Sequence, residues 1–273
     1  MIRAPSLFVG LGQPPLVLFE DSYSLALREF GQRLGKLQAI IAVSSQWVSP
    51  GPIQITSAKI PSLEKNFYGF QDEIYDLEYP APGNPDLSFR LLEMFESEGF
   101  EAMLNPDAGI DHGVWMPLLR IRPKADVPVI QISLPVLDDP RKLLQLGHIL
   151  APLREEGILL LGSGAAALNP GKLVWSSGEK NVNRHILNFD QWLQEKFQRA
   201  QIEDILNYRK VAPGVKYAHP QETHILPLFF IMGTSLNGDS PGILYRGYRY
   251  ESQSLLSLTL GDSGVPSPSA LQH

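Results

Sequence analysis

Short, almost uninterrupted apolar runs alternate along this chain with longer segments of helical composition. The runs end at Gly or Ser, as do strands that are buried on both faces of a sheet. They cover residues 6–10, 39–44, 127–133 and 158–162. Between and after them, helices are expected over residues 23–34, 87–97, 141–156 and 184–199. This alternation predicts an α/β fold with a central, mostly parallel sheet that is flanked by helices.

The rest of the chain fits one domain. Its 273 residues are within the range of single α/β domains, which often reach about 250 residues. A further helix is expected within 222–233, and residues 243–249 and 255–260 are expected to form a closing pair of strands. We find no linker and no repeat. The prediction is therefore a single domain over residues 1–262, followed by a flexible C-terminal tail at 263–273 that is rich in Ser and Pro.

Composition narrows the classes of function. With 23 Lys and Arg against 29 Asp and Glu, the net charge is −6, and nucleic acid is not expected as a partner because phosphate binding needs a basic excess. The absence of Cys excludes disulfides, a thiolate nucleophile, iron–sulfur clusters and Cys-ligated zinc. No apolar run reaches the roughly 18 residues of a membrane span. We therefore expect a cytoplasmic protein without membrane association, whose partner is a small molecule.

The fold class also indicates where a ligand binds. In open α/β sheets, ligands bind beyond the carboxyl ends of the strands, so the loops after Val9, Val43 and Leu161 are the expected position. The last of these loops contains the small residues GSGAAA at 162–167. Small side chains permit close approach of either a ligand or a neighbouring helix. The sequence leaves both explanations open.

Three of the six histidines lie in segments that indicate a role in chemistry. His112 lies in a loop-like stretch, GIDHGVW, beside Asp111, which either orients the imidazole or caps the loop. His219 and His224 flank Glu222, and two histidines with a carboxylate are typical of a facial iron triad. Pro220 interrupts that stretch, however, and triad ligands normally come from separate elements. A metal site made from this stretch alone is therefore not favoured.

Longer motifs occur in an order that is characteristic of one enzyme family. They are YGF, IY and YPAPG within 68–83, IDHGVW at 110–115, THILPL at 223–228 and SQSLLS at 252–257. They resemble the YGFP…LY…YPAPG, FDHGSW, EHYLPL and SLSMLS stretches of the DODA-type class III extradiol ring-opening dioxygenases, the family that contains 4,5-DOPA dioxygenase. The chain is identified as a divergent member over nearly its whole length. The resemblance implies the α/β fold of that family's catalytic subunit and a small aromatic or phenolic ligand.

The resemblance also implies a set of metal-binding positions, of which this chain keeps one histidine. The family holds a divalent metal through histidines of its GHGSP, SAHW and SGNxVHN motifs, with a contribution from the histidine of EHYLPL. The matching residues here are Leu11, Gln46, Leu168 and His224. The family's acid/base histidine, in the DHG motif, is kept as His112. The chain thus lacks most of the expected metal ligands.

A rough free energy shows what this loss means. A structural zinc site binds with roughly 10–16 kcal/mol through four ligands, or about 3 kcal/mol for each ligand. One remaining imidazole then gives a dissociation constant of about a millimolar or weaker. Leu has no lone pair, and Gln is a poor substitute for imidazole. We therefore expect no metal and no other cofactor, and we expect metal-dependent extradiol cleavage to be lost.

Without a metal, the two retained histidines are the catalytic candidates. His112, beside apolar side chains, is expected to stay neutral and to act as a base, and His224 is expected to act as the partner acid or to bind an oxyanion. The Gln46 amide is suited to orient a carbonyl or a carboxylate. Proton transfer, a lyase reaction or a cofactor-independent cleavage of a small aromatic, phenolic or enolisable substrate fits such a site. The expected substrate-binding residues are Leu11, Gln46, Trp47, Phe70, Asp111, Trp115 and Leu168.

Other interpretations stay open at this point. The chain can be a decayed copy without activity, although an intact His112, Phe70 and Trp115 argue against random decay. It can be a ligand-binding pseudoenzyme or the non-catalytic partner of a paralogous subunit, and it can also form a homo-oligomer. It can finally be a metal-dependent dioxygenase that uses atypical ligands. Family membership alone does not decide among these functions.

Overall fold

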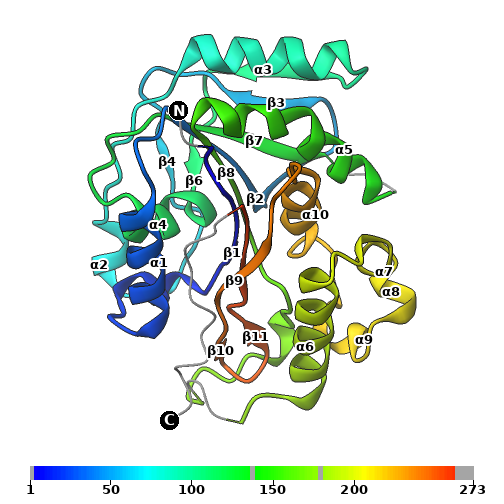
Figure 1. The fold of residues 1–273 in the computed structure, drawn as a ribbon. Coiled ribbons are helices and arrows are strands. Elements are labelled where there is room, and N and C mark those ends of the chain that lie inside the picture. Colours follow the sequence, from blue (N-terminus) through cyan, green and yellow to red (C-terminus); the bar gives the residue numbers. More distant parts are fainter. Residues whose placement is uncertain (1–2, 136–138, 178–180, 262–273) are drawn as a thin grey trace.

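The computed structural model describes residues 3–135, 139–177 and 181–261. Eight of its strands form one twisted sheet in the order β5-β3-β7-β2-β8-β1-β12-β9 (Figure 1). The four central strands all run parallel to one another; they are β7 (Val129–Pro135), β2 (Ala39–Ser49), β8 (Ile158–Gly164) and β1 (Ser6–Gly10). The single-domain α/β fold with a mostly parallel central sheet is therefore confirmed.

The outer strands extend this parallel centre on both sides. On one side, β12 (Ser257–Leu260) runs antiparallel to β1 and to the edge strand β9 (Pro241–Tyr245), so the expected closing pair is present. On the other side, β3 (Ile53–Thr56) is antiparallel to β7 and parallel to the edge strand β5 (Ala102–Asn105). Two small two-stranded sheets lie outside this main sheet: β4 (Leu63–Glu64) with β6 (Ile110–Asp111), and β10 (Tyr248–Arg249) with β11 (Gln253–Ser254).

Helices cover both faces of the sheet (Figure 1). One face packs against α1 (Ser22–Arg33) and α4 (His112–Ile121). The other packs against α3 (Pro85–Ser97), α5 (Arg141–Leu150), α6 (Arg184–Gln198) and α10 (Leu226–Gly233). Short helical segments complete the chain: α2 (Asp72–Tyr75), α7 (Ile202–Leu206), α8 (Tyr208–Val211), α9 (Val215–Ala218), η1 (Pro14–Leu18), η2 (Ala151–Glu156) and η3 (Pro170–Lys172).

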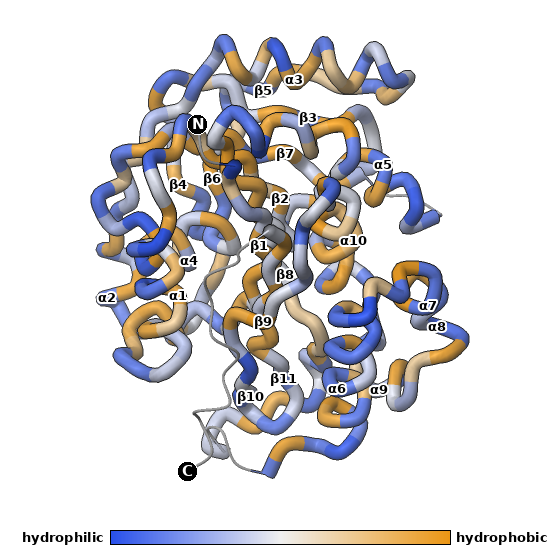
Figure 2. The backbone as a smooth tube through the Cα atoms, in the orientation of Figure 1, coloured by the Kyte–Doolittle hydropathy of each residue, from blue (hydrophilic) through white to orange (hydrophobic). Residues whose placement is uncertain are grey.

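Figure 2 shows the hydrophobic character of this arrangement: the central strands and α10 are orange, whereas α3 and α6 alternate between hydrophobic and hydrophilic residues. α10 is buried nearly all round, because it packs on β8 and β1 on one side and on α5 on the other. Burial of its apolar side chains is the main favourable contribution to this packing. The sheet is therefore enclosed between two hydrophobic cores.

Several predicted boundaries differ from the structure. β2 does not end at residue 44 but continues to Ser49, with an irregular register between Val43 and Val48. The helix expected over 141–156 changes at Ala151 to a 3₁₀ turn, because Pro152 cannot donate the next backbone hydrogen bond. The helix expected within 222–233 begins at Leu226, with Pro227 in its first turn.

Residues 112–115 form the largest departure, since this stretch is not a loop but opens α4. The helix contains Pro117, and the mixture of Gly and Pro in this segment obscures the helical periodicity of its apolar residues.

No described helix is both long and apolar enough to cross a membrane. The tail predicted at 263–273 lies outside the described residues.

A buried ion pair lies at the amino ends of the central strands. Arg154 is completely buried, and its guanidinium pairs with the carboxylate of Asp239. The same guanidinium donates hydrogen bonds to three backbone oxygens: those of Ala4 at 2.9 Å, Thr234 at 2.7 Å and Leu260 at 3.1 Å. Each of its three nitrogens therefore has a partner, and the pair joins the start of β1 to the end of β12.

Candidate active site

A cleft of about 290 Å³ opens at the carboxyl ends of β1, β2 and β8. This is the end of the sheet at which α/β proteins bind ligands. Six of the nine predicted site residues line the cleft: Leu11, Gln46, Phe70, His112, Leu168 and His224. The three loops that were predicted from the strand pattern thus meet at one place, together with residues from α4 and from the segment before α10.

His112 is the first residue of α4, and the side chains of Ser44 and Asp111 pack closely against the backbone of the next residue. The next residue is Gly113, where a Cβ atom would collide with the Ser44 hydroxyl and crowd the Asp111 carboxylate. Asp111 directly precedes His112. Its backbone amide donates to the Gln131 side-chain oxygen at 2.8 Å, and the Gln131 side-chain amide donates back to the Asp111 carboxylate. This reciprocal pair fixes the start of α4 against β7.

The imidazole of His112 lies in an apolar surrounding. It is only 7% exposed, and the ring of Phe67 meets it edge-on at a centroid distance of 5.2 Å. Burial lowers the pKa of His112 to about 4, since a low-dielectric surrounding disfavours the charged form. Its Nδ1 atom is buried and makes no hydrogen bond to a described residue. The imidazole is therefore neutral at physiological pH.

His224 reaches the cleft because two glycines allow the segment before α10 to approach β8. A Cβ atom on Gly164 would collide with the His224 carbonyl, and one on Gly162 would collide with Pro227 and Ile231. The same carbonyl accepts a hydrogen bond from the Ala165 amide at 2.8 Å. Burial also lowers the pKa of His224. The small residues at 162–167 therefore serve close packing, and Gly164 and Ala165 line the cleft as well.

Asp111 does not orient the imidazole of His112. Its carboxylate accepts a hydrogen bond from Gln131. Although Asp111 occupies the N-cap position of α4, its side chain makes no capping hydrogen bond there, so neither of the two roles left open by the sequence is seen. Burial raises the pKa of Asp111 to about 6, against the opposing effects of Gln131, Ser44 and the amides of α4. Asp111 is thus a buried support for the site and does not line it.

Two further predicted residues also lie outside the cleft lining. Trp115 is fully buried in the core beneath α4 and donates to the Glu64 carbonyl at 3.2 Å. Trp47 directly follows Gln46 in β2, and successive side chains of a strand point to opposite sides. Neither tryptophan is among the residues that line the cleft.

The residues at the expected metal positions do not fit a divalent metal. Leu11 and Leu168 are 8% and 4% exposed and offer no lone pair, and Gln46 is the one amide among them. No three His, Cys, Asp or Glu side chains converge on a possible metal position anywhere in residues 3–135, 139–177 and 181–261. His219 does not join His224, because it is buried among Phe189 and Tyr208 and bonds the Ala166 carbonyl at 2.6 Å.

Sequence reasoning missed part of the lining. Gln253, Phe67 and Leu173 also face the cleft. Gln253 belongs to a two-residue strand, and its buried amide gives no signal in an apolar pattern. Phe67 precedes the YGF motif and was not singled out. The signal that could have found them is their place in the motifs, because Gln253 is the second residue of SQSLLS and Phe67 directly precedes YGF.

Aromatic side chains and one strained turn lie next to Phe70 of the cleft lining. Phe70 lies 6.1 Å from the ring of Trp175, which lies 4.8 Å from that of Tyr250. Tyr250 and Glu251 both have positive φ angles, of 53° and 61°, which is unfavourable for residues with a Cβ. The carbonyls of residues 250, 251 and 252 accept hydrogen bonds from the amides of residues 174, 183 and 169. The turn therefore anchors the segment that carries Trp175.

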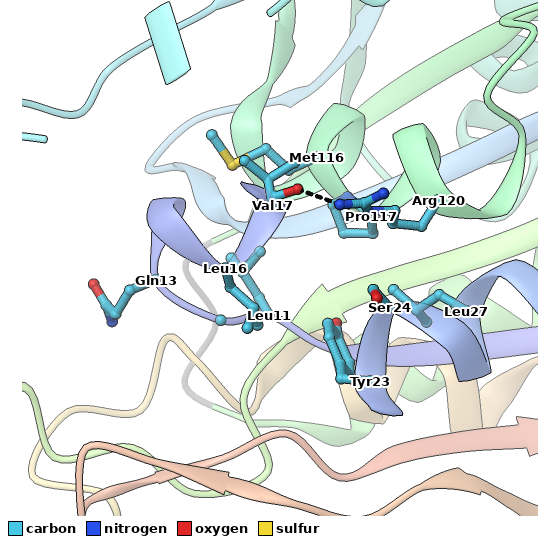
Figure 3. A pocket seen from close by; sticks show the side chains of 11 residues that line it. Leu11, Gln13, Leu16, Val17, Tyr23, Ser24, Leu27, Met116, Pro117 and Arg120 are labelled. Atoms are coloured by element: carbon cyan, nitrogen blue, oxygen red, sulfur yellow. Dashed lines mark hydrogen bonds between the residues drawn. The ribbon is translucent and has the colours of Figure 1, made fainter. Parts of the chain in front are cut away.

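A second, much smaller cavity of about 30 Å³ lies behind one wall of the cleft (Figure 3). Leu11, Gly12 and Gln13 line both spaces. Figure 3 shows Leu11 and Leu16 at the centre of this cavity, whereas the Gln13 amide points away from Tyr23 and Leu27. Arg120 closes one side by donating to the Val17 carbonyl at 2.6 Å. This cavity holds no more than about one water molecule.

Comparison with known proteins places the chain among ring-opening dioxygenases. Residues 12–256 match the family described as the catalytic LigB subunit of aromatic ring-opening dioxygenase. A 4,5-DOPA dioxygenase extradiol of Escherichia coli K12 is 32% identical over 95% of both chains, and one of Portulaca grandiflora is 35% identical over 77% of this chain and 78% of its own. A crystal structure of an uncharacterized protein from Escherichia coli K12 superposes with a TM-score of 0.80 at 29% identity, covering 94% of this chain and 99% of that one.

Proposed function

The chain belongs to the LigB family of aromatic ring-opening dioxygenases, and from this premise we propose that it catalyses acid/base chemistry without a metal. The substrate would be a small aromatic, phenolic or enolisable molecule. One observation carries the proposal: a neutral, buried His112 faces a cleft in which Leu11 and Leu168 occupy the expected positions of metal ligands. Loss of the ligands together with retention of this histidine favours a reused site.

The proposed first step is removal of a proton from the substrate by His112. Because its pKa is about 4, the imidazole is unprotonated and available as an acceptor at any pH near neutrality. The same low pKa makes the imidazolium that forms a strong acid, which readily returns the proton. Return of the proton to a different atom of the substrate gives a tautomer, with atoms and charge in balance. A pKa of about 4 also makes neutral His112 a weaker base than free imidazole, so the proposed reaction requires a substrate proton that is already acidic, such as that of a phenol or of a carbon beside a carbonyl group.

The other polar groups of the cleft have supporting roles in this proposal. The His224 residue is half-buried, and its imidazole makes no hydrogen bond to another described residue, so the imidazole is free to donate to a developing oxyanion. Gln46 is exposed to the cleft and offers both a donor and an acceptor to a carbonyl or carboxylate. Phe67, Phe70 and Leu173 supply apolar surface for a planar ring. Such a mixture of apolar walls and few polar groups is typical of small-molecule sites.

One observation supports ligand binding without catalysis as the second candidate. A catalytic histidine is usually oriented by a hydrogen bond to its second nitrogen, but the Nδ1 atom of His112 has no such partner among the described residues. Asp111, the nearest carboxylate in sequence, is engaged with Gln131 instead. A pseudoenzyme that binds an aromatic ligand would keep the cleft and would not need this orientation.

The decisive experiment measures proton exchange with an enolisable aromatic probe. Phenylpyruvate is incubated with the full-length protein in deuterated water, and incorporation of deuterium at its benzylic carbon is followed by NMR. We expect the wild-type protein to accelerate exchange, His112→Ala to abolish the acceleration, and His224→Gln to reduce it about tenfold. The matched control is His148→Ala on the exposed face of α5. Equal exchange by the wild-type and His112→Ala proteins would overturn the catalytic proposal and leave ligand binding.

The metal-free part of the proposal has its own test. Protein purified without chelators should contain far less than one iron or zinc per chain by elemental analysis, and stoichiometric metal would restore the metal-dependent dioxygenase as the function. The combined substitution Leu11→His, Gln46→His and Leu168→His tests the geometry, because four imidazoles would then surround one point. Metal uptake by this variant is expected. No uptake would mean that the cleft has changed shape as well as ligands.

A further inference from the structure

Gln253 is the one cleft residue whose amide is fixed on one side and unsatisfied on the other. Its side chain is buried, at 1% exposure, and it lines the cleft. The Nε2 atom donates a hydrogen bond to the Leu11 carbonyl at 3.0 Å. The Oε1 atom is buried and has no hydrogen-bond partner among the described residues. An acceptor left unpaired in an interior is unfavourable, so its retention calls for an explanation.

The surrounding backbone holds this amide in place. Gln253 forms a bridge with Leu168 and pairs with Arg249 across the β10–β11 hairpin. Its neighbours are fixed too, because the Ser252 carbonyl accepts from the Asn169 amide at 3.0 Å and the Ser254 amide donates to the Ala167 carbonyl at 2.8 Å. The hydrogen bond to Leu11 then sets which end of the amide is the donor. The acceptor oxygen is therefore preorganised.

Gln253 lies between the two leucines that occupy expected metal-ligand positions, since it bonds the backbone of Leu11 and bridges that of Leu168. Around these apolar side chains the local dielectric is low, which strengthens any hydrogen bond made there. The unpaired oxygen is thus the main polar feature of an otherwise apolar corner. Eight buried side-chain atoms without partners occur in the described residues, and only those of His112 and Gln253 belong to the cleft lining.

We propose that the Gln253 amide oxygen binds and orients the ligand by accepting a hydrogen bond from one of its hydroxyl groups. The inference rests on the proposed function in that it concerns the same cleft, but it does not require turnover. It assigns the ligand a hydroxyl attached to an apolar ring: the ring packs on Leu11, Leu168 and Phe67, and the O–H group meets Gln253. A site that offers a buried, unpaired acceptor favours a donor-bearing ligand over its methyl ether, because the ether leaves the acceptor unsatisfied.

The test compares two probes of nearly the same shape: catechol, which has two donors, and 1,2-dimethoxybenzene, which has none. Dissociation constants are measured by NMR titration of the full-length, isotope-labelled protein. We expect the wild-type protein to bind catechol about tenfold more tightly than the dimethyl ether. In Gln253→Met, which keeps the length of the side chain, this preference should disappear while the affinity for the ether stays within twofold.

Two further variants separate ligand recognition from structural support. Gln194→Met is the matched control, because the buried oxygen of Gln194 on α6 also lacks a partner but lies away from the cleft, and its catechol preference should equal that of the wild type. Gln253→Glu removes the donor to the Leu11 carbonyl and should also lose the preference, because the acceptor oxygen is then no longer held in place. If Gln253 only stabilises the fold, Gln253→Met lowers the thermal midpoint and leaves the affinity ratio unchanged.

That unchanged ratio, or a wild-type protein that binds neither probe at millimolar concentration, would overturn the inference. Failure of the proposed function looks different. In that case deuterium exchange is absent or independent of His112, whereas the preference for catechol and its loss in Gln253→Met persist. The two proposals can therefore fail separately.

Discussion

The Arg154 cluster at one end of the central sheet and the cleft at the other end differ in how their buried polar side chains are paired. At the amino ends of the strands, all three nitrogens of the Arg154 guanidinium are paired, either with Asp239 or with backbone carbonyls. At the carboxyl ends, the cleft leaves the Nδ1 atom of His112 and the Oε1 atom of Gln253 without partners in the described structure. The side chains compared, Arg154, His112 and Gln253, are all buried, so solvent exposure does not explain the difference.

The contrast shows how to separate stabilising polar groups from those that are available to a ligand. A buried group whose hydrogen bonds are all made contributes to folding and has no remaining capacity. A buried group with free capacity costs stability. Where such a group also lines a cleft, as His112 and Gln253 do and Gln194 does not, a ligand can supply the missing partner. By this criterion the Arg154 cluster is structural, and the cleft is the end of the sheet at which we propose that a ligand binds.

The largest expected effect tests the structural end. Arg154→Met removes the guanidinium and leaves the carboxylate of Asp239 buried without its main partner, which should lower the free energy of unfolding by about 3–5 kcal/mol. Urea denaturation followed by circular dichroism measures the change. Adding Asp239→Leu should recover part of the loss, because no unpaired charge then remains.

The matched control for that substitution is Arg90→Met. Arg90 pairs with Glu156 on the surface, where the two side chains are 45% and 42% exposed. Solvent screening limits such pairs to about 1 kcal/mol or less. If both arginine variants lost the same stability, complete hydrogen bonding would not be what distinguishes the Arg154 cluster.

A smaller loss is expected from crowding the cleft. Gly164→Ala places a methyl group against the His224 carbonyl and should cost about 1–3 kcal/mol while displacing the imidazole of His224. The control is Gly35→Ala, since no atom lies within 4 Å of the added methyl group there. Denaturation and catechol titration measure both effects. An unchanged catechol affinity in Gly164→Ala would show that the position of His224 does not matter for binding.

The smallest effect is a pH dependence of stability that His112 contributes. Between pH 6.5 and 4, the unfolded chain binds a proton at this histidine that the folded chain does not, because burial lowers the folded pKa to about 4. Falling pH therefore favours unfolding. The stability of the wild type relative to His112→Asn should decrease by about 1–2 kcal/mol from pH 7 to pH 5. Denaturation at both pH values checks this, with His148→Asn as control, and an increase would contradict it.

Much of the fold could be predicted because the central strands are continuous apolar runs. β1 has the predicted bounds of residues 6–10, and α6 differs from the prediction by one residue at its end. β3 and β5 were missed, since each is four residues long and lies toward an edge of the sheet, where tertiary pairing rather than local pattern decides. The extension of β2 through polar Ser44–Gln46 has the same cause.

The site residues that belong to recognisable motifs could be predicted from the sequence. The residues that reach the cleft only through the packing of the fold could not. Leu11, Gln46, Leu168 and His224 were found from the resemblance, and each lines the cleft. Their proposed roles stay predictions. Trp115 belongs to an equally clear motif, but it lies in the core. A sequence motif does not distinguish a residue that lines a cleft from one that is buried behind the lining.

Three consecutive carbonyls of the turn at residues 250–252 fasten three separate points of the segment between Asn169 and Asn183. Asn169, Val174 and Asn183 are thus far from the turn in sequence but are fixed to it by hydrogen bonds. An insertion or deletion in the segment or in the turn would break the match at three places at once. Engineers who wish to graft a different segment onto this scaffold would therefore need to transplant both pieces together, and natural divergence should have changed them in step.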